Sequence, residues 1–124
     1  VMQLDKEYRE FVYDKIKDKI DDSFKEWSYK ALDWEFHPVR QDNSLVAVVM
    51  SLENEVHVAI DQTYKGRWLS KGTIDKILGE KLAKYGSVKT CVGMDNEIGK
   101  RFVERLGFEA DTTNYVLEEL NHAR

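Results

Sequence analysis

The sequence feature that most constrains this chain is the segment Val56–Gly72, VHVAIDQTYKGRWLSKG, which reads as a strand, a loop and the start of a helix. Alternating apolar residues predict a strand that runs to Ile60 and stops at Asp61. The loop that follows carries two basic side chains around a glycine, in the segment Lys65–Arg67. Because a helix start presents unpaired backbone N–H groups and a partial positive charge, this order of elements predicts a cradle for a phosphate group.

Length and composition suit one folded domain that mixes helices and strands. The 124 residues are 42% apolar and 34% charged, and they include a single proline. That balance is typical of a globular protein rather than of a disordered chain. We therefore expect one domain over 1–124, of the α+β (mixed α/β) class.

The N-terminal part of the chain is expected to be helical. Apolar residues at helical spacing predict an amphipathic helix over 4–20, with charges of both signs on its other face. Asp22 or Ser23 is expected to cap a short second helix that turns Trp27 inward.

Three antiparallel strands are expected next. Alternating apolar and polar residues predict a strand over 32–37 that ends near Pro38, because proline cannot donate to a strand ladder. The apolar run 45–52 predicts a central strand, and residues 53–55 predict a tight turn into the strand 56–60.

The rest of the sequence predicts helices and strands in alternation, with glycines closing the helices. The expected elements are a helix over 74–85 closed by Gly86, a strand over 88–94, a helix opened by Asp95 or Asn96 and closed by Gly107, and strand material over 108–120.

Charge and cysteine content argue against several classes of function. The net charge is −4 with the two signs interspersed, so neither nucleic acid nor an anionic membrane is expected as the main partner. The run 45–52 is too short to cross a bilayer.

One cysteine, Cys91, allows no intrachain disulfide and no cysteine-based metal cluster, and we expect it to be buried in the strand 88–94. His37 and His122 show no metal-ligand spacing. The chain is therefore expected in the cytoplasm or inside a particle.

The element order and two segments resemble the GNAT (GCN5-related N-acetyltransferase) fold, with a mixed central sheet flanked by helices. The segment 61–70, DQTYKGRWLS, resembles the family's pyrophosphate loop for acyl-CoA. The segment 96–108, NEIGKRFVERLGF, resembles the family's helix that an asparagine opens and a glycine–phenylalanine pair closes. The resemblance covers roughly residues 30 to 120.

The resemblance implies an acyl-CoA, for example acetyl-CoA, as cofactor and an amine as the acceptor of the acyl group. Carried over by position, the implied cofactor-binding residues are Ile60, Asp61, Lys65, Gly66, Arg67, Ser70, Lys71 and Asn96. Asn96 serves equally well as an ordinary helix cap that needs no cofactor.

Three positions depart from the family pattern. Trp68 and Ser70 stand where the family prefers small residues or glycine, which let backbone N–H groups approach a phosphate without a Cβ in the way. Val103 stands where the family has a tyrosine that often protonates the departing thiolate, and valine has no proton to give.

The transfer also needs a base that takes a proton from the amine, and the resemblance places it near the strand that precedes the loop. His57 and Glu55 share one face of that strand, so both are candidates. Histidine side chains titrate near neutral pH, which favours His57. A sheet-face histidine and a turn glutamate without a catalytic role are the open alternative.

Two hypotheses of different classes follow. The first is an acyl-CoA-dependent N-acyltransferase. The second is a GNAT-like protein that has lost catalysis and serves as a binding or assembly component, with a protein partner or as a homo-oligomer. Compact, motif-poor GNAT-like proteins occur among tailed bacteriophages, including virion and head-assembly proteins, and this chain is similar in its brevity and altered loop.

Overall fold

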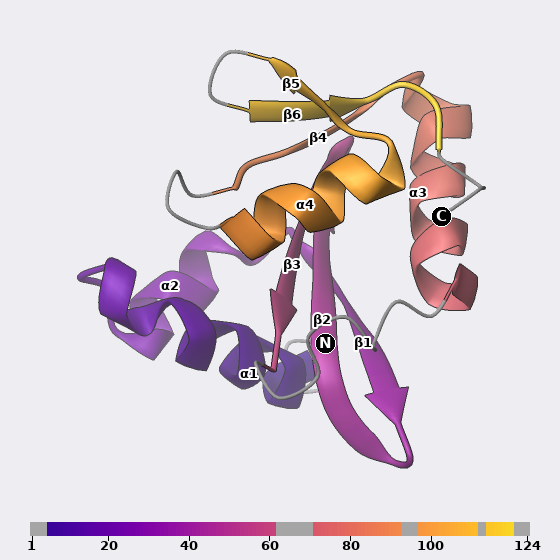
Figure 1. Ribbon diagram of the computed structural model, residues 1–124. Coiled ribbons are helices and arrows are strands. Elements are labelled where there is room, and N and C mark those ends of the chain that lie inside the picture. Colours follow the sequence, from indigo (N-terminus) through magenta and orange to yellow (C-terminus); the bar gives the residue numbers. More distant parts are fainter. Residues whose placement is uncertain (1–4, 62–70, 93–96, 112–113, 121–124) are drawn as a thin grey trace. The chain divides into compact units, whose positions relative to one another are not determined.

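The computed structural model describes residues 5–61, 71–92, 97–111 and 114–120 (Figure 1). Over these residues six strands are hydrogen-bonded in the order β1-β2-β3-β4-β6-β5, with four α-helices in the same part of the chain. Antiparallel and parallel pairs both occur. The predicted α+β class with a mixed sheet is therefore confirmed.

The contacts group the chain into two compact units that divide β3 between His57 and Val58. The first unit contains the chain up to Leu52 and the second half of β3. The second contains Glu53–His57 and everything from helix α3 onward. This grouping does not test the expectation of a single domain over 1–124, which stays a prediction.

In the first unit, two helices lie side by side and pack against strands β1 and β2 (Figure 1). Helix α1 spans Lys6–Ile16 and continues as one 3₁₀ turn, Lys17–Lys19, before Ile20 takes an extended backbone conformation. The helix predicted over 4–20 was therefore too long. Helix α2 spans Phe24–Lys30. Ser23 caps its N-terminus, which confirms one of the two residues predicted as the cap.

Strands β1 (Glu35–Gln41) and β2 (Ser44–Leu52) form an antiparallel hairpin. Its turn residues Asp42 and Asn43 both have positive φ, 51° and 69°, as a type I′ turn requires. The expectation that a strand ends near Pro38 was wrong, because Pro38 lies inside β1 opposite Val48. Proline is tolerated there because β1 is at one end of the strand order, where N–H groups on one side have no strand partner.

Leu32 is a second correction in this unit. The sequence placed it in the strand with its side chain inward, but residues 31–33 form turns and Leu32 is 45% exposed. The N–H groups of Ala31 and Leu32 donate to the carbonyls of Trp27 and Tyr29, so turn geometry persists beyond α2. The strand can therefore begin only at Glu35.

The core of the first unit lies between the two helices and the hairpin. Its buried members are Val12, Trp27, Ala31, Phe36, Val48 and Ala59. The central strand β2 was predicted correctly, since Val46, Ala47, Val48 and Val49 are all at most 1% exposed. None of the helices that the structure describes is long and apolar enough to cross a bilayer.

Strand β3 spans Glu55–Ile60 and joins the two units. The turn before it consists of Glu53 and Asn54, with Glu53 at φ 52°. Glu55, expected in the turn, is the first residue of the strand and pairs in parallel register with Lys89.

The second unit contains helix α3 (Lys71–Tyr85), strand β4 (Val88–Thr90), helix α4 (Glu97–Leu106) and the strands β5 (Glu109–Asp111) and β6 (Asn114–Leu117). Strand β6 pairs antiparallel with both β4 and β5 (Figure 1). Gly86 at φ 83° and Gly107 at φ 114° follow the two helices, which confirms both predicted helix ends.

One face of β4 and β6 carries much of the buried core of this unit. Val88 and Leu117 are fully buried and lie opposite each other, and Thr90 and Tyr115 form the next buried pair in the same register. Cys91 is exposed, so the expectation of a buried cysteine was wrong. The reason is that only one face of this segment is buried: Val88 and Thr90 are buried, Lys89 between them is exposed, and Cys91 falls on the side of Lys89 in the same alternation.

Candidate functional site

The two candidate bases, His57 and Glu55, are in direct contact. Nε2 of His57 lies 2.6 Å from Oε2 of Glu55, a hydrogen-bonding distance for a charge-assisted pair. Residues two apart on a strand point to the same face, which is how β3 brings the two side chains together. Their side chains are 30% and 43% exposed, respectively, so solvent reaches both. The structure thus joins two residues that the sequence could only place on one strand face.

This contact constrains the tautomer of His57 when the Glu55 carboxyl is ionised. An ionised carboxylate only accepts hydrogen bonds, so Nε2 of His57 must carry the hydrogen that points to Glu55. If the imidazole gains a second proton, the nearby carboxylate stabilises the resulting positive charge. The arrangement matches the contact between a histidine and an orienting carboxylate.

The backbone around Glu55 is fixed by β4. Glu55 is in parallel register with Lys89, and the Lys89 N–H donates to the carbonyl of Asn54 over 2.8 Å. Between the two site residues, Val56 is 4% exposed and faces the opposite side of the strand. The strand that carries the pair is thus held in place by the buried side chain of Val56.

Lys89 is a neighbour that sequence reasoning missed. It is exposed, and its Cα is paired with that of Glu55. The signal that could have found it is the strand–helix–strand order of this part of the chain, because two strands joined through a helix commonly pair in parallel. The sequence gives no register for that pairing, so it could not name the opposite residue.

The strand end and the helix expected around the phosphate loop are in the predicted order. Ile60 ends β3, and the N–H of Asp61 donates to the carbonyl of Val46 over 2.9 Å, which ties this point to β2. Both residues are half-buried. The chain is described again from Lys71, the first residue of α3.

Most of the predicted cofactor contacts lie outside the described residues. These are Lys65, Gly66, Arg67, Ser70 and Asn96, together with Trp68 in the same loop. For Lys71 the structure describes the backbone of the helix start and not the side chain. The roles assigned to these residues stay predictions.

Val103 is in the described part of helix α4. It is 7% exposed, one turn before the buried Leu106. Its burial fits a packing role, and an aliphatic side chain supplies no acid to a reaction. Over the described residues, no group of three or more His, Cys, Asp or Glu side chains is arranged to hold a metal ion.

Comparisons with known proteins bear on the fold. No family model matches the chain, and no curated protein matches it in sequence. Among solved structures, the chain is similar to the PaiA N-acetyltransferase from Thermoplasma acidophilum, crystallised in complex with coenzyme A. The likeness has a TM-score of 0.58 and covers 97% of this chain and 92% of the other, at 15% identity. At that identity it shows a GNAT-like fold and nothing more specific.

Proposed function

We propose that this chain is an acyl-CoA-dependent N-acyltransferase in which His57 and Glu55 act as the base. The observation that carries the proposal is the 2.6 Å contact between the two side chains on β3, the strand that precedes the expected phosphate loop. The fold neighbour crystallised with coenzyme A supports an acyl-CoA as the donor. We take acetyl-CoA as the donor to test first.

The proposed role of the pair is to remove a proton from the acceptor amine. The imidazole of His57 takes that proton, and the Glu55 carboxylate stabilises the imidazolium. An acceptor that arrives as an ammonium would thus become a free amine, whose lone pair would form the C–N bond as the C–S bond of the thioester breaks. The second proton that the nitrogen loses on becoming an amide would pass to solvent. Since Val103 has no proton to give, the thiolate that leaves would be protonated by solvent.

The proposed cofactor site uses the strand end and the helix start. Ile60 and Asp61 would border it, Lys65 and Arg67 would contribute positive charge, and the α3 N-terminus at Lys71 would present backbone N–H groups to the pyrophosphate. Gly66, Ser70 and Asn96 complete the proposed set. Trp68 would have to turn away from the ligand.

Binding of acetyl-CoA to the full chain tests this site. A ligand that binds only the folded state raises the free energy of unfolding by about 2.7 kcal/mol at a concentration of about 100 Kd. We expect thermal unfolding to shift upward with acetyl-CoA, and calorimetry to give a saturable heat. Desulfo-CoA keeps the pyrophosphate and should also bind. No shift and no heat at saturating acetyl-CoA would refute both the site and the enzyme.

A second candidate function is a GNAT-like binding or assembly protein without catalysis, for example a component of a bacteriophage particle. Val103, buried where the resemblance places the tyrosine acid, is the observation that favours it. This candidate predicts a folded protein that does not catalyse acyl transfer, with or without acetyl-CoA binding. Its own partner surface is a separate question.

A further inference from the structure

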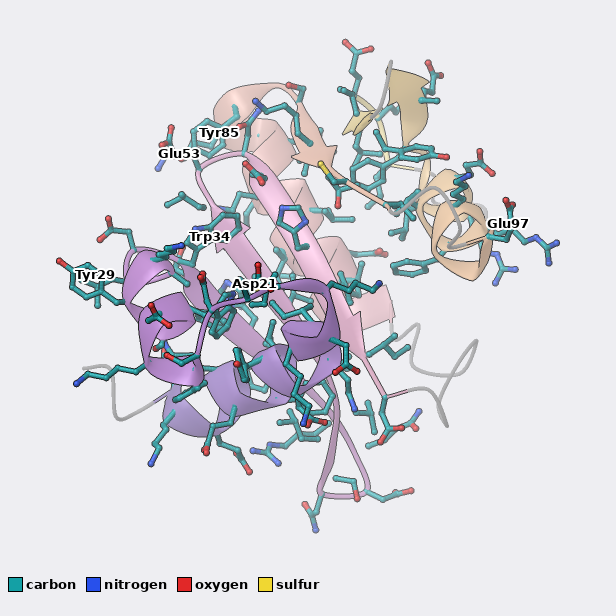
Figure 2. The ribbon with its side chains drawn as sticks, turned by 90° about the vertical axis from the view of Figure 1, so that its left-hand side faces the viewer. Asp21, Tyr29, Trp34, Glu53, Tyr85 and Glu97 are labelled. Atoms are coloured by element: carbon teal, nitrogen blue, oxygen red, sulfur yellow. The ribbon has the colours of Figure 1, made fainter. Side chains whose placement is uncertain are left out.

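The end of helix α3 carries two lysines that share one aromatic ring. The Nζ atoms of Lys81 and Lys84 lie 5.7 Å and 5.2 Å from the centroid of the Tyr85 ring. Tyr85 is 38% exposed, and Figure 2 shows it at the outer end of its helix. Two ammonium groups and a partly exposed ring therefore form one surface feature, which we call the Tyr85 cluster.

Neither lysine is paired with a carboxylate of the residues that the structure describes. Within the described residues no acidic oxygen lies within 4.0 Å of the Lys81 or Lys84 ammonium group. Glu80 stands four residues before Lys84, the favourable order for a helical ion pair, yet the Lys84 ammonium lies near the ring instead. The cluster thus keeps two positive charges in a chain whose net charge is −4.

Helix stability accounts for only part of this arrangement. Cations in the last turn interact favourably with the negative end of the helix dipole, which explains Lys84. It does not explain an exposed tyrosine between the two lysines. Exposed aromatic rings are typical of protein contact surfaces, where tyrosine is enriched.

We propose that the Tyr85 cluster docks an acidic segment of a partner protein. Carboxylates of the partner would pair with the ammonium groups of Lys81 and Lys84, and an apolar side chain beside them would cover the Tyr85 ring. This interaction surface does not depend on the proposed acyl transfer.

The number of charges favours a protein segment over other polyanions. Specific nucleic-acid binding uses about 6–10 phosphate contacts, and attachment to an anionic membrane uses clusters of about 4–8 Lys or Arg residues. The Tyr85 cluster supplies two lysines. Two carboxylates and one apolar side chain match it in both charge and size.

Fluorescence anisotropy with a labelled peptide tests the proposal. The probe is a fluorescein-labelled polyglutamate peptide with a central phenylalanine, titrated with the full chain at low ionic strength. We expect the double variant Lys81→Gln/Lys84→Gln to raise Kd about tenfold, and Tyr85→Ala to raise it severalfold. Lys76→Gln is the matched control, since Lys76 is an exposed lysine of the same helix, and it should leave Kd unchanged.

Control measurements separate binding of the acidic peptide from nonspecific binding and from a preference for other polyanions. A matching peptide with glutamine in place of glutamate should not bind. Thermal unfolding of each variant checks that the exposed substitutions leave the fold intact. The proposal is overturned if the acidic peptide does not bind, if the glutamine peptide binds equally well, or if Lys76→Gln weakens binding as much as the double variant. Tighter binding of a single-stranded oligonucleotide or of anionic vesicles than of the peptide would overturn it too.

Discussion

Arg9 of helix α1 places its guanidinium carbon 4.4 Å from the centroid of the Phe36 ring on strand β1. The side chain is almost fully buried, and its nitrogens donate to Asp5 Oδ1 and to the Ser28 carbonyl over 2.9 and 3.0 Å. Further donations reach Ser28 Oγ over 3.3 Å and the Leu32 carbonyl over 3.5 Å. One arginine thus links α1, the end of α2 and β1, and the sequence pattern had assigned it to a solvated helix face.

Replacing Arg9 should therefore cost far more stability than its place in a charged helix suggests. Arg9→Met keeps the apolar stem but leaves buried carbonyl groups without donors, so we expect a loss of about 2–3 kcal/mol in the free energy of unfolding. Arg40→Met is the control, since Arg40 also pairs with a carboxylate and lies 5.9 Å from a tyrosine ring but is exposed. It should change stability little. Equal losses for the two variants in urea unfolding would contradict the role of Arg9.

Gly79 inside helix α3 and Gly86 just after it should respond oppositely to alanine. A Cβ at Gly79 or at Gly86 would meet no atom within 4 Å, so crowding does not decide the outcome. Gly79 lies inside the helix, where alanine is favoured by about 0.5–1 kcal/mol. Gly86 has φ 83°, and a side chain in that region costs about 1–2 kcal/mol. We expect Gly79→Ala to raise Tm and Gly86→Ala to lower it. A shift of both variants in the same direction would contradict these backbone conformations.

Helix α2 begins with a reciprocal cap whose stability should depend on pH. Ser23 Oγ accepts from the Glu26 N–H over 3.2 Å, and Glu26 Oε1 accepts from the Ser23 N–H over 3.0 Å. The hydrogen bond from the Ser23 backbone lowers the pKa of the Glu26 carboxyl in the folded protein. A lowered folded-state pKa means that the carboxylate stabilises the fold above the unfolded pKa, and that this stabilisation is lost as pH falls through the folded value.

Two variants separate the halves of this cap. Glu26→Gln should be less stable than the parent at neutral pH, and the difference should vanish in acid. Ser23→Ala should cost about 1 kcal/mol at neutral pH and keep part of that cost in acid, because its oxygen accepts from a backbone N–H that does not titrate. Urea unfolding across acidic and neutral pH measures both. A Glu26→Gln difference that grows as pH falls would contradict the sign.

Local signals in the sequence predicted the helix ends and the central strand well. Gly86, Gly107 and Ser23 act through their own backbone or side chain, so the sequence carries their effect directly. The run 45–52 is apolar on both faces because both faces of β2 are buried. These features depend on neighbours close in sequence or on burial alone.

The errors share a different cause, which is contact between distant segments. Arg9 is buried because Ser28 and Leu32 accept its hydrogen bonds. Cys91 is exposed because only the face of β4 that carries Val88 and Thr90 is buried, opposite Leu117 and Tyr115 of β6. The candidate site shows the same limit, since the sequence placed His57 and Glu55 on one face but could not show that they touch. The loop residues from Lys65 to Ser70 remain predictions from sequence alone.

The most direct test of the proposed function is the rate of acyl transfer at saturating acetyl-CoA, with His57→Gln compared with the parent chain. A panel of primary amines serves as acceptors, and a thiol reagent follows the release of CoA. Removing a base typically slows transfer by about 10²–10⁴-fold. We expect that loss in kcat for His57→Gln and a smaller one for Glu55→Gln, with binding of acetyl-CoA retained.

His37→Gln is the matched control, because His37 is also a half-buried sheet histidine, with Nε2 3.3 Å from Ser51 Oγ. This variant should transfer at the parent rate. Transfer by the parent chain that is unchanged in His57→Gln, or no transfer to any of the amines, would contradict the account.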